Sequence, residues 1–220
     1  MKNFQLEGTP RDVLGKKAVK AIRKEDGIPA VLYGSEPITL PYEGKLNKGE
    51  SLIETADGKG LIVTNFTVTN EAVRKLIYTP EVFLVELSLI GSKKVMAIIK
   101  DTQFQPVNDS ILHIDFLEIF EKKPIVIEVP VKLEGHSEGV KAGGKLSLEM
   151  RKLKVRALYK DIPEELTIDI TNLGLGKTIQ VGSLHFDKLE LVNAKNAVVC
   201  AVKLTRAARG AQAAAAASGK

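Results

Sequence analysis

The sequence predicts a mainly β protein with a few short helices, divided into two domains. Short apolar segments rich in Val, Ile and Leu recur along the chain, separated by turns that contain Gly or Pro. This is the pattern of all-β domains. A length of 220 residues lies between one large domain and two of ordinary size. The polar run Glu121-Lys122-Lys123-Pro124 is the best candidate linker, so we expect domains at 1–121 and 122–206 and a disordered Ala-rich tail at 207–220.

Composition and charge limit the classes of function. Hydrophobic residues make up 44% of the chain and charged residues 27%, which indicates real cores beneath a soluble surface. No apolar run approaches the ~20 residues that a membrane span needs, and the N-terminal residues lack the apolar region of a signal peptide. The single cysteine, Cys200, excludes an internal disulfide and fits a reducing cytoplasm. A net charge of +5 suggests an anionic partner, but only weakly in a chain of this length.

The first domain is expected to begin with a strand at 3–9 that ends at Pro10. An amphipathic helix follows from Gly15 to Asp26, where Gly27 is well placed to end it. Polar residues at 44–60 predict a loop with room for one short strand, and a second short helix is expected at 72–78, capped by residues 69–71. The remaining apolar segments predict strands, the first two as a hairpin, at 30–34, 38–43, 61–68, 82–90, 94–101 and 111–120.

The second half continues with short strands, which suggests a second β-sandwich or a barrel-like domain. Connectors rich in Gly and Pro separate the strands, among them GHSEGVKAGG at 135–144. The expected strands are 125–133, 153–159, 166–170, 189–192 and 197–204.

The first helix has one fully basic side. At about 100° per residue, its cations fall within an arc of about 120°. Arg11 precedes the helix, only Asp12 opposes these charges, and Tyr33 ends the strand that follows. Such a helix suits the phosphates of a nucleic acid, although a solvated lysine-rich face is also common. The helix cations are Lys16, Lys17, Lys20, Arg23 and Lys24.

His113 and Asp115 stand on one face of the strand 111–120, about 7 Å apart along it. An aspartate near phosphates is costly unless it accepts hydrogen bonds, for instance from a guanine amino group or a ribose 2′-hydroxyl. Tyr33 can stack on a base or sugar. Because the wide minor groove of RNA exposes such groups, the set fits structured RNA better than B-form DNA.

Other chemistry finds little support in the sequence. The segment TNLGLGKT at 171–178 resembles a phosphate-binding loop but has Thr171 where that motif needs Gly. The three histidines have no metal-ligand spacing, so we expect no metal and no cofactor. His113 beside Asp115 could orient a general base, yet no nucleophile is recognisable, so a hydrolase is disfavoured. The alternative for the pair is two polar residues on an exposed strand face.

Three segments of the first half, RDVLGKKAVKAIRK, GIPAVLYG and LHIDF, resemble the bacterial ribosomal protein L twenty-five family. The second half resembles the family's long form, the general stress protein (CTC) type. The resemblance implies an N-terminal β-barrel that binds 5S ribosomal RNA in the minor groove of loop E, and an added C-terminal β domain. The implied RNA-contacting residues are Arg11, Lys16, Lys20, Arg23, Tyr33, His113 and Asp115, to which we add Lys17 and Lys24 on charge and helix position.

The resemblance implies a non-catalytic role in translation. The partners would be 5S RNA, the large ribosomal subunit and neighbouring ribosomal proteins, with no membrane and no small-molecule substrate. The chain departs from many relatives by having Ala21 in place of a basic residue, and it is longer than the short members within 44–69. The competing hypothesis is a stress-related protein-binding module that works off the ribosome through its C-terminal domain.

Overall fold

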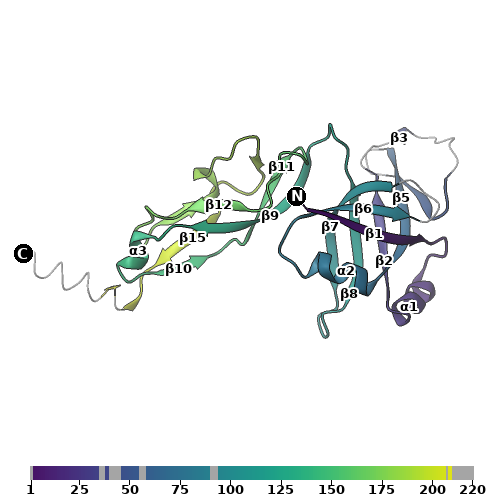
Figure 1. The fold of residues 1–220 in the computed structure, drawn as a ribbon, viewed down its shortest axis with the longest axis horizontal. Helices are drawn as coiled ribbons and strands as arrows, with labels where there is room; N and C mark the ends of the chain where they lie inside the picture. The colour runs from purple at the N-terminus through teal and green to yellow at the C-terminus, as the bar shows by residue number, and fades with distance from the viewer. Residues whose placement is uncertain are drawn as a thin grey trace, which may run out of the picture. The chain divides into compact units, whose positions relative to one another are not determined.

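The computed structural model describes residues 2–34, 38–39, 46–54, 58–89, 94–206 and 208–209. It confirms a mainly β protein with a few short helices. The chain divides into two compact units, Met1–Lys123 and Pro124–Lys220, each described by itself below. Figure 1 shows the strands and helices of both units. Apart from residues 208 and 209, the tail expected to be disordered lies outside the described residues.

The first unit contains a closed barrel of six strands in the order β1-β6-β7-β8-β2-β5 (Figure 1). Pairing of Thr9 with Thr67 returns β1 to β5 and closes the barrel. The pairs β1–β6 and β2–β8 are parallel, and the other pairs are antiparallel. The barrel strands are β1 (Lys2–Pro10), β2 (Gly27–Tyr33), β5 (Lys59–Thr69), β6 (Phe83–Leu89), β7 (Lys94–Phe104) and β8 (Ile111–Glu118).

The barrel interior is filled by the apolar residues that alternate along its strands. Phe66 and Phe116 are fully buried, with ring centroids 5.7 Å apart. Helix α2 (Asn70–Ile77) adds Val73 and Leu76 to the same core. Burial of one such side chain is worth about 1.5–3 kcal/mol, so this core stabilises the scaffold that carries the polar outer face.

Helix α1 (Lys16–Lys24) buries none of its residues completely. Val19 and Ile22 are half-buried, which leaves the basic side exposed. The helix ends before the predicted Gly27, because Asp26 adopts the left-handed conformation with φ 60°. Gly27 instead begins β2, where an added Cβ would lie 2.8 Å from Cγ2 of Ile22. The close approach of α1 to β2 therefore requires this glycine.

The predicted hairpin between 30–34 and 38–43 is wrong. Both edges of β2 are occupied, by β5 and β8, and β3 (Ile38–Thr39) pairs with β5 instead. Residues 40–45 lie outside the described part of the chain. Among the described residues of the polar segment 44–60, β4 (Glu50–Glu54) is a short strand that also pairs with β5, and β5 itself begins at Lys59.

The second unit consists of two sheets, with strand orders β12-β9-β11-β14 and β10-β15-β13. Strand β9 pairs with β11 along its first part and with β12 along its last four residues. The expected segments did not include β10 and β13, which are short. The elements are β9 (Ile125–Glu134), α3 (Glu138–Lys141), β10 (Lys145–Leu148), β11 (Lys152–Ala157), β12 (Leu166–Asp169), β13 (Thr178–Gln180), a 3-10 turn (Val181–Ser183), β14 (Glu190–Leu191) and β15 (Val198–Lys203).

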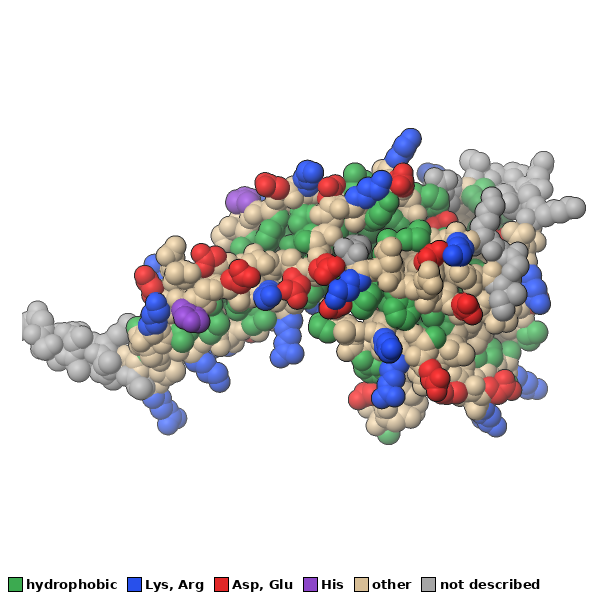
Figure 2. Space-filling view, in the orientation of Figure 1, with side chains coloured by type: hydrophobic (Ala, Val, Ile, Leu, Met, Phe, Trp, Pro, Cys, Tyr) green, Lys and Arg blue, Asp and Glu red, His purple; other side chains and the backbone are tan. Residues whose placement is uncertain are grey.

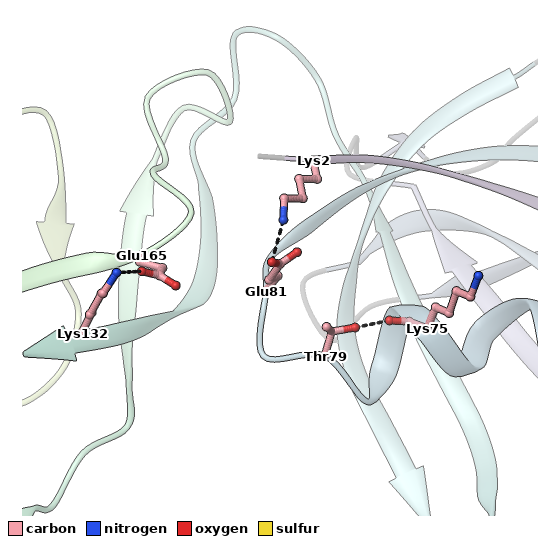
Figure 3. Close-up of polar contacts among 6 residues, drawn as sticks. All are labelled: Lys2, Lys75, Thr79, Glu81, Lys132 and Glu165. Carbon is pink, nitrogen blue, oxygen red and sulfur yellow. Dashed lines mark hydrogen bonds and ion pairs between the residues drawn. The ribbon is translucent and has the colours of Figure 1, made fainter.

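Charged side chains of both signs are scattered over the visible face, among hydrophobic and other residues (Figure 2). Lys2 and Glu81, 2.6 Å apart, join β1 to the connection before β6, and the hydroxyl of Thr79 donates to the Lys75 carbonyl at the end of α2 (Figure 3). In the second unit, Lys132 of β9 lies 3.4 Å from Glu165, just before β12 (Figure 3). Exposed ion pairs contribute at most about 1 kcal/mol each, so the cores provide most of the stability.

Candidate nucleic-acid interface

The basic face of α1 borders a groove of about 730 Å³ on the first unit. Within the described residues, none of the five helix cations forms an ion pair. Residues 1–123 hold seventeen basic and seventeen acidic side chains, so this concentration of positive charge is local. Lys17 is exposed but does not line the groove. The lining residues are Arg11, Leu14, Gly15, Lys16, Val19, Lys20, Arg23 and Lys24.

Arg11 is held by its backbone and has free side-chain donors. Its amide donates to the Asn65 carbonyl at 3.0 Å, which fixes the chain where β1 ends. Its Nε and Nη1 atoms are buried and have no hydrogen-bond partner within the described structure. Burial, and secondarily the charge of Arg23, lower the pKa of the guanidinium. Buried donors without partners are costly, and an anion in the groove would relieve both that cost and the repulsion.

Arg23 connects the helix to the barrel strand that carries His113. Its Nη2 donates to the carbonyl of Leu112 at 2.8 Å. Because Leu112 directly precedes His113 in β8, this bond places the basic face beside the polar face of that strand. Figure 1 shows α1 at the lower end of the barrel in this view, the end at which β8 is labelled. The two groups of site residues identified in the sequence, 90 positions apart, are therefore one surface.

His113, Asp115 and Tyr33 form the other part of this surface. Nδ1 of His113 lies 2.9 Å from Oδ1 of Asp115, and about a fifth of each side chain is exposed. Asp115 pairs with Val31 in the sheet, and Tyr33 lies two residues further along the same face. Burial, and then the charge of Asp115, raise the pKa of the Tyr33 phenol. The hydroxyl therefore remains a hydrogen-bond donor at neutral pH.

Strand β7 adds three residues to this face that were not predicted. A register shift between Ile99 and Asp101 makes Lys100 the extra residue of a bulge, and its Nζ lies 5.6 Å from the centroid of the Tyr33 ring. Gln103 stands opposite His113, and Asp101 stands opposite Asp115. Strand pairing decides these positions, so no spacing in the sequence could have shown them.

The arrangement combines a cationic groove with a neighbouring set of hydrogen-bonding groups and one aromatic ring. Asp101 and Asp115 stand directly opposite each other, and like charges in that relation destabilise a sheet. A ligand that donates hydrogen bonds to these carboxylates would relieve the repulsion. Among the described residues, no three His, Cys, Asp or Glu side chains are grouped so that they could hold a metal ion. Such an arrangement can bind a polyanion that also carries hydrogen-bond donors.

Comparison with known proteins identifies the family. The model described as "Ribosomal L25p family" matches residues 6–53 and 55–116, which include every candidate site residue. The chain belongs to this family. The model described as "Ribosomal protein TL5, C-terminal domain" matches residues 124–206 of the second unit.

Curated relatives are similar over nearly their whole length, and each is named large ribosomal subunit protein bL25. The one from Porphyromonas gingivalis is 63% identical over 211 residues, covering 96% of this chain and 97% of its own. The relative from Parabacteroides distasonis is 61% identical over 218 residues, with coverage of 97% and 99%. The relative from Bacteroides thetaiotaomicron is 54% identical over 220 residues, with coverage of 98% and 99%.

Membership of the L25p family makes the chain a ribosomal protein, a structural and non-enzymatic component of a ribonucleoprotein. The hydrolase considered for His113 is thereby set aside. Within the described residues, no helix has the length and apolar character needed to cross a membrane.

Proposed function

We propose that this ribosomal protein binds 5S ribosomal RNA on the surface made by α1 and the adjoining faces of β2, β7 and β8. The observation that carries the proposal is the bond from Arg23 to the Leu112 carbonyl, which joins the basic helix to the His113 strand. The relatives' name supports a place in the large ribosomal subunit. There the protein would help to hold 5S RNA in the central protuberance of cytoplasmic ribosomes.

The two parts of the surface have different tasks in this proposal. The cations of Arg11 and α1 neutralise phosphates and position the RNA without reading its sequence. Tyr33, His113 and Asp115 meet groove edges and sugars, where Asp115 accepts from an amino group or a 2′-hydroxyl. The minor groove of an irregular RNA helix such as loop E exposes these groups. The RNA-binding residues proposed are Arg11, Lys16, Lys17, Lys20, Arg23, Lys24, Tyr33, His113 and Asp115.

The positioning task is tested by removing two helix cations from the full chain. We expect the variant Lys16→Gln/Lys20→Gln to weaken 5S RNA binding about tenfold near 0.1 M salt and to reduce the salt slope by roughly two, because each phosphate contact contributes about 0.9. Variant Arg74→Gln/Lys75→Gln on α2 removes the same charge and should stay within about twofold of the parent. Filter binding over a salt series measures both.

The reading task is tested on intact 5S RNA and on 5S RNA without loop E. We expect Asp115→Asn to reduce the preference for the intact RNA about tenfold, because a hydrogen-bonding group left without its partner costs about 1–3 kcal/mol. Binding to the RNA without loop E should not change. Full 5S RNA affinity in a chain with Arg23, Tyr33 and His113 all changed to Ala would disprove the site. If the protein sediments separately from ribosomal particles, the result would favour the stress-related protein-binding module instead.

A further inference from the structure

Two glycine-rich segments of the second unit, 135–144 and 171–178, take no part in the proposed 5S RNA surface but pack directly against each other. The hydroxyl of Ser137 donates to the Leu173 carbonyl at 2.6 Å, and the amide of Gly139 donates to the same carbonyl at 2.9 Å. A Cβ added at Gly139 would lie 2.6 Å from the carbonyl carbon of Gly174. The segments therefore form one rigid end of the unit, with backbone against backbone.

The residues after β15 join this end. The Thr205 hydroxyl donates to the Gly143 carbonyl at 2.6 Å and accepts the amide of Ala208 at 3.2 Å. Ala208 is buried, and the amide of Arg209 donates to the Thr205 carbonyl at 3.0 Å. These hydrogen bonds hold a short helical turn against Gly143. The turn places Arg206 and Arg209 beside the two glycine-rich segments.

Exposed cations surround this end of the second unit, and Figure 2 shows Lys and Arg side chains projecting there. Within the described residues, none of the five cations listed below forms an ion pair. Glu138 is the acidic residue within these segments, and Glu134, Glu149 and Asp169 flank them. Glu149 is paired with Lys203 at 2.7 Å, and Asp169 accepts hydrogen bonds from Thr171. We call the group the cationic end, and it consists of Lys141, Lys145, Lys177, Arg206 and Arg209.

Strand pairing places one like-charged pair at the cationic end, although Glu149 partly offsets it through its ion pair with Lys203. Lys145 of β10 stands directly opposite Lys203 of β15, and like charges in that relation destabilise a sheet. The neighbouring sheet is built differently, since Lys154 faces Glu128 and Arg156 faces Glu190 across adjacent strands at 3.8 and 3.5 Å. The five cations of the cationic end form no ion pair within the described residues, so they are available to an anion.

We propose that the cationic end is a second RNA-binding surface, which holds the sugar-phosphate backbone of ribosomal RNA independently of the 5S RNA surface. Three of its five cations are lysines, which bind phosphates as point charges and need no exact angle. Four cations on three contacting segments, with Lys145 at the start of β10, match a run of phosphates, and a ribosomal protein is surrounded by RNA. Val140 and Leu204 are also exposed at the cationic end. Because exposed apolar side chains suit a protein partner, an acidic protein is the competing occupant.

The test uses the full chain and, as the probe, 23S ribosomal RNA freed of proteins and of 5S RNA. We expect Lys141→Gln/Lys145→Gln/Lys177→Gln to weaken binding about tenfold near 0.1 M salt and to reduce the salt slope by roughly two to three, at about 0.9 per phosphate. The matched control is Lys132→Gln/Lys154→Gln/Lys188→Gln, which removes three ion-paired lysines of the same unit. The control should stay within about twofold of the parent.

Equal losses in the two triple variants would show an effect of net charge alone and would overturn the proposal. An unchanged RNA affinity in the first variant would also overturn the proposal. If the parent but not that variant then captured an acidic protein, the surface would be assigned to a protein partner. The first variant should keep its 5S RNA affinity, whereas Lys16→Gln/Lys20→Gln loses it, so the two proposals fail separately. In assembled large subunits, ultraviolet crosslinks from the peptides of the cationic end to RNA are the expected positive result.

Discussion

Two residues of the proposed 5S RNA surface are positioned by hydrogen bonds to the backbone of the barrel. Arg11 is fixed by its amide on Asn65, and Arg23 by the carbonyl of Leu112. The helical spacing of the cations already indicated an RNA-binding face in the sequence, and the structure brings most of them to one groove. What the spacing could not show are the buried free donors of Arg11, since burial depends on strands distant in the sequence.

At the scale of one residue, Asp169 is expected to make the stability of the fold depend on pH. Hydrogen bonds from the hydroxyl and then the amide of Thr171 lower the pKa of this carboxyl below its ordinary 3.8. A depressed pKa stabilises the fold above the ordinary value, and this contribution is lost as the pH falls through the folded-state pKa. We therefore expect the stability difference between the parent and Asp169→Asn to be largest near neutrality and to shrink below about pH 4.

Urea unfolding of both chains between about pH 7 and pH 2 measures this difference. A difference that stays constant or grows on acidification would contradict the role given to the carboxylate. Thr171→Val removes the hydroxyl donor and is expected to show a smaller dependence on pH than the parent.

At the scale of elements, short contacts determine where the helices and turns lie. Helix α1 approaches β2 over Gly27, and α3 approaches the turn at 174–175 over Gly139. In the second case the helix itself is one turn long, so its position depends on this contact more than on helical propensity. The glycine-rich pattern of 135–144 was predicted as a connector, and the structure shows that it is a packing surface.

We expect Gly139→Ala to destabilise the second unit by about 1–3 kcal/mol, because the new Cβ would meet the backbone of Gly174 and Leu175. This cost exceeds the gain of about 1 kcal/mol that alanine brings within a helix. Chemical denaturation followed by circular dichroism measures the change.

The matched control is Gly174→Ala on the opposite side of the same contact. A Cβ there would have the flexible Lys177 side chain as its nearest neighbour, at 3.6 Å, so its effect should stay within about 0.5 kcal/mol. Equal destabilisation by the two variants would show that the packing account is wrong.

For the whole molecule, each unit has its own core. Phe116 and Ile114 are fully buried in the barrel, whereas Leu153 and Val155 are fully buried in the second unit. Separate cores are the physical condition for separate folding. The proposed RNA contacts are divided in the same way, with one surface on each unit.

Equilibrium unfolding of the full chain is expected to show two transitions. Phe116→Ala should lower the first unit's stability by about 3–5 kcal/mol, and Leu153→Ala the second unit's by about 2–5 kcal/mol, each without moving the other transition. Fluorescent labels placed on each unit separately follow the two transitions. A single transition displaced by both variants would show that the units unfold together.

The sequence by itself determined the features that depend on local periodicity. It predicted a mainly β chain, the strands around Phe66 and Phe116, the basic side of α1, and His113 and Asp115 on one strand face. Each of these follows from side-chain directions that repeat every two residues in a strand or about every 3.6 in a helix. The second-half strands β10 and β13 were missed because three or four residues show no clear period.

Only the tertiary structure decided how distant strands pair. The expected hairpin of β2 was wrong because β5 and β8 occupy both of its edges. The bulge that adds Lys100 to the polar face, the bond from Arg23 to Leu112, and Lys145 opposite Lys203 are likewise results of pairing. These contacts join residues distant in the sequence, and the periodicity within one strand shows which face is buried but not which strand becomes its neighbour.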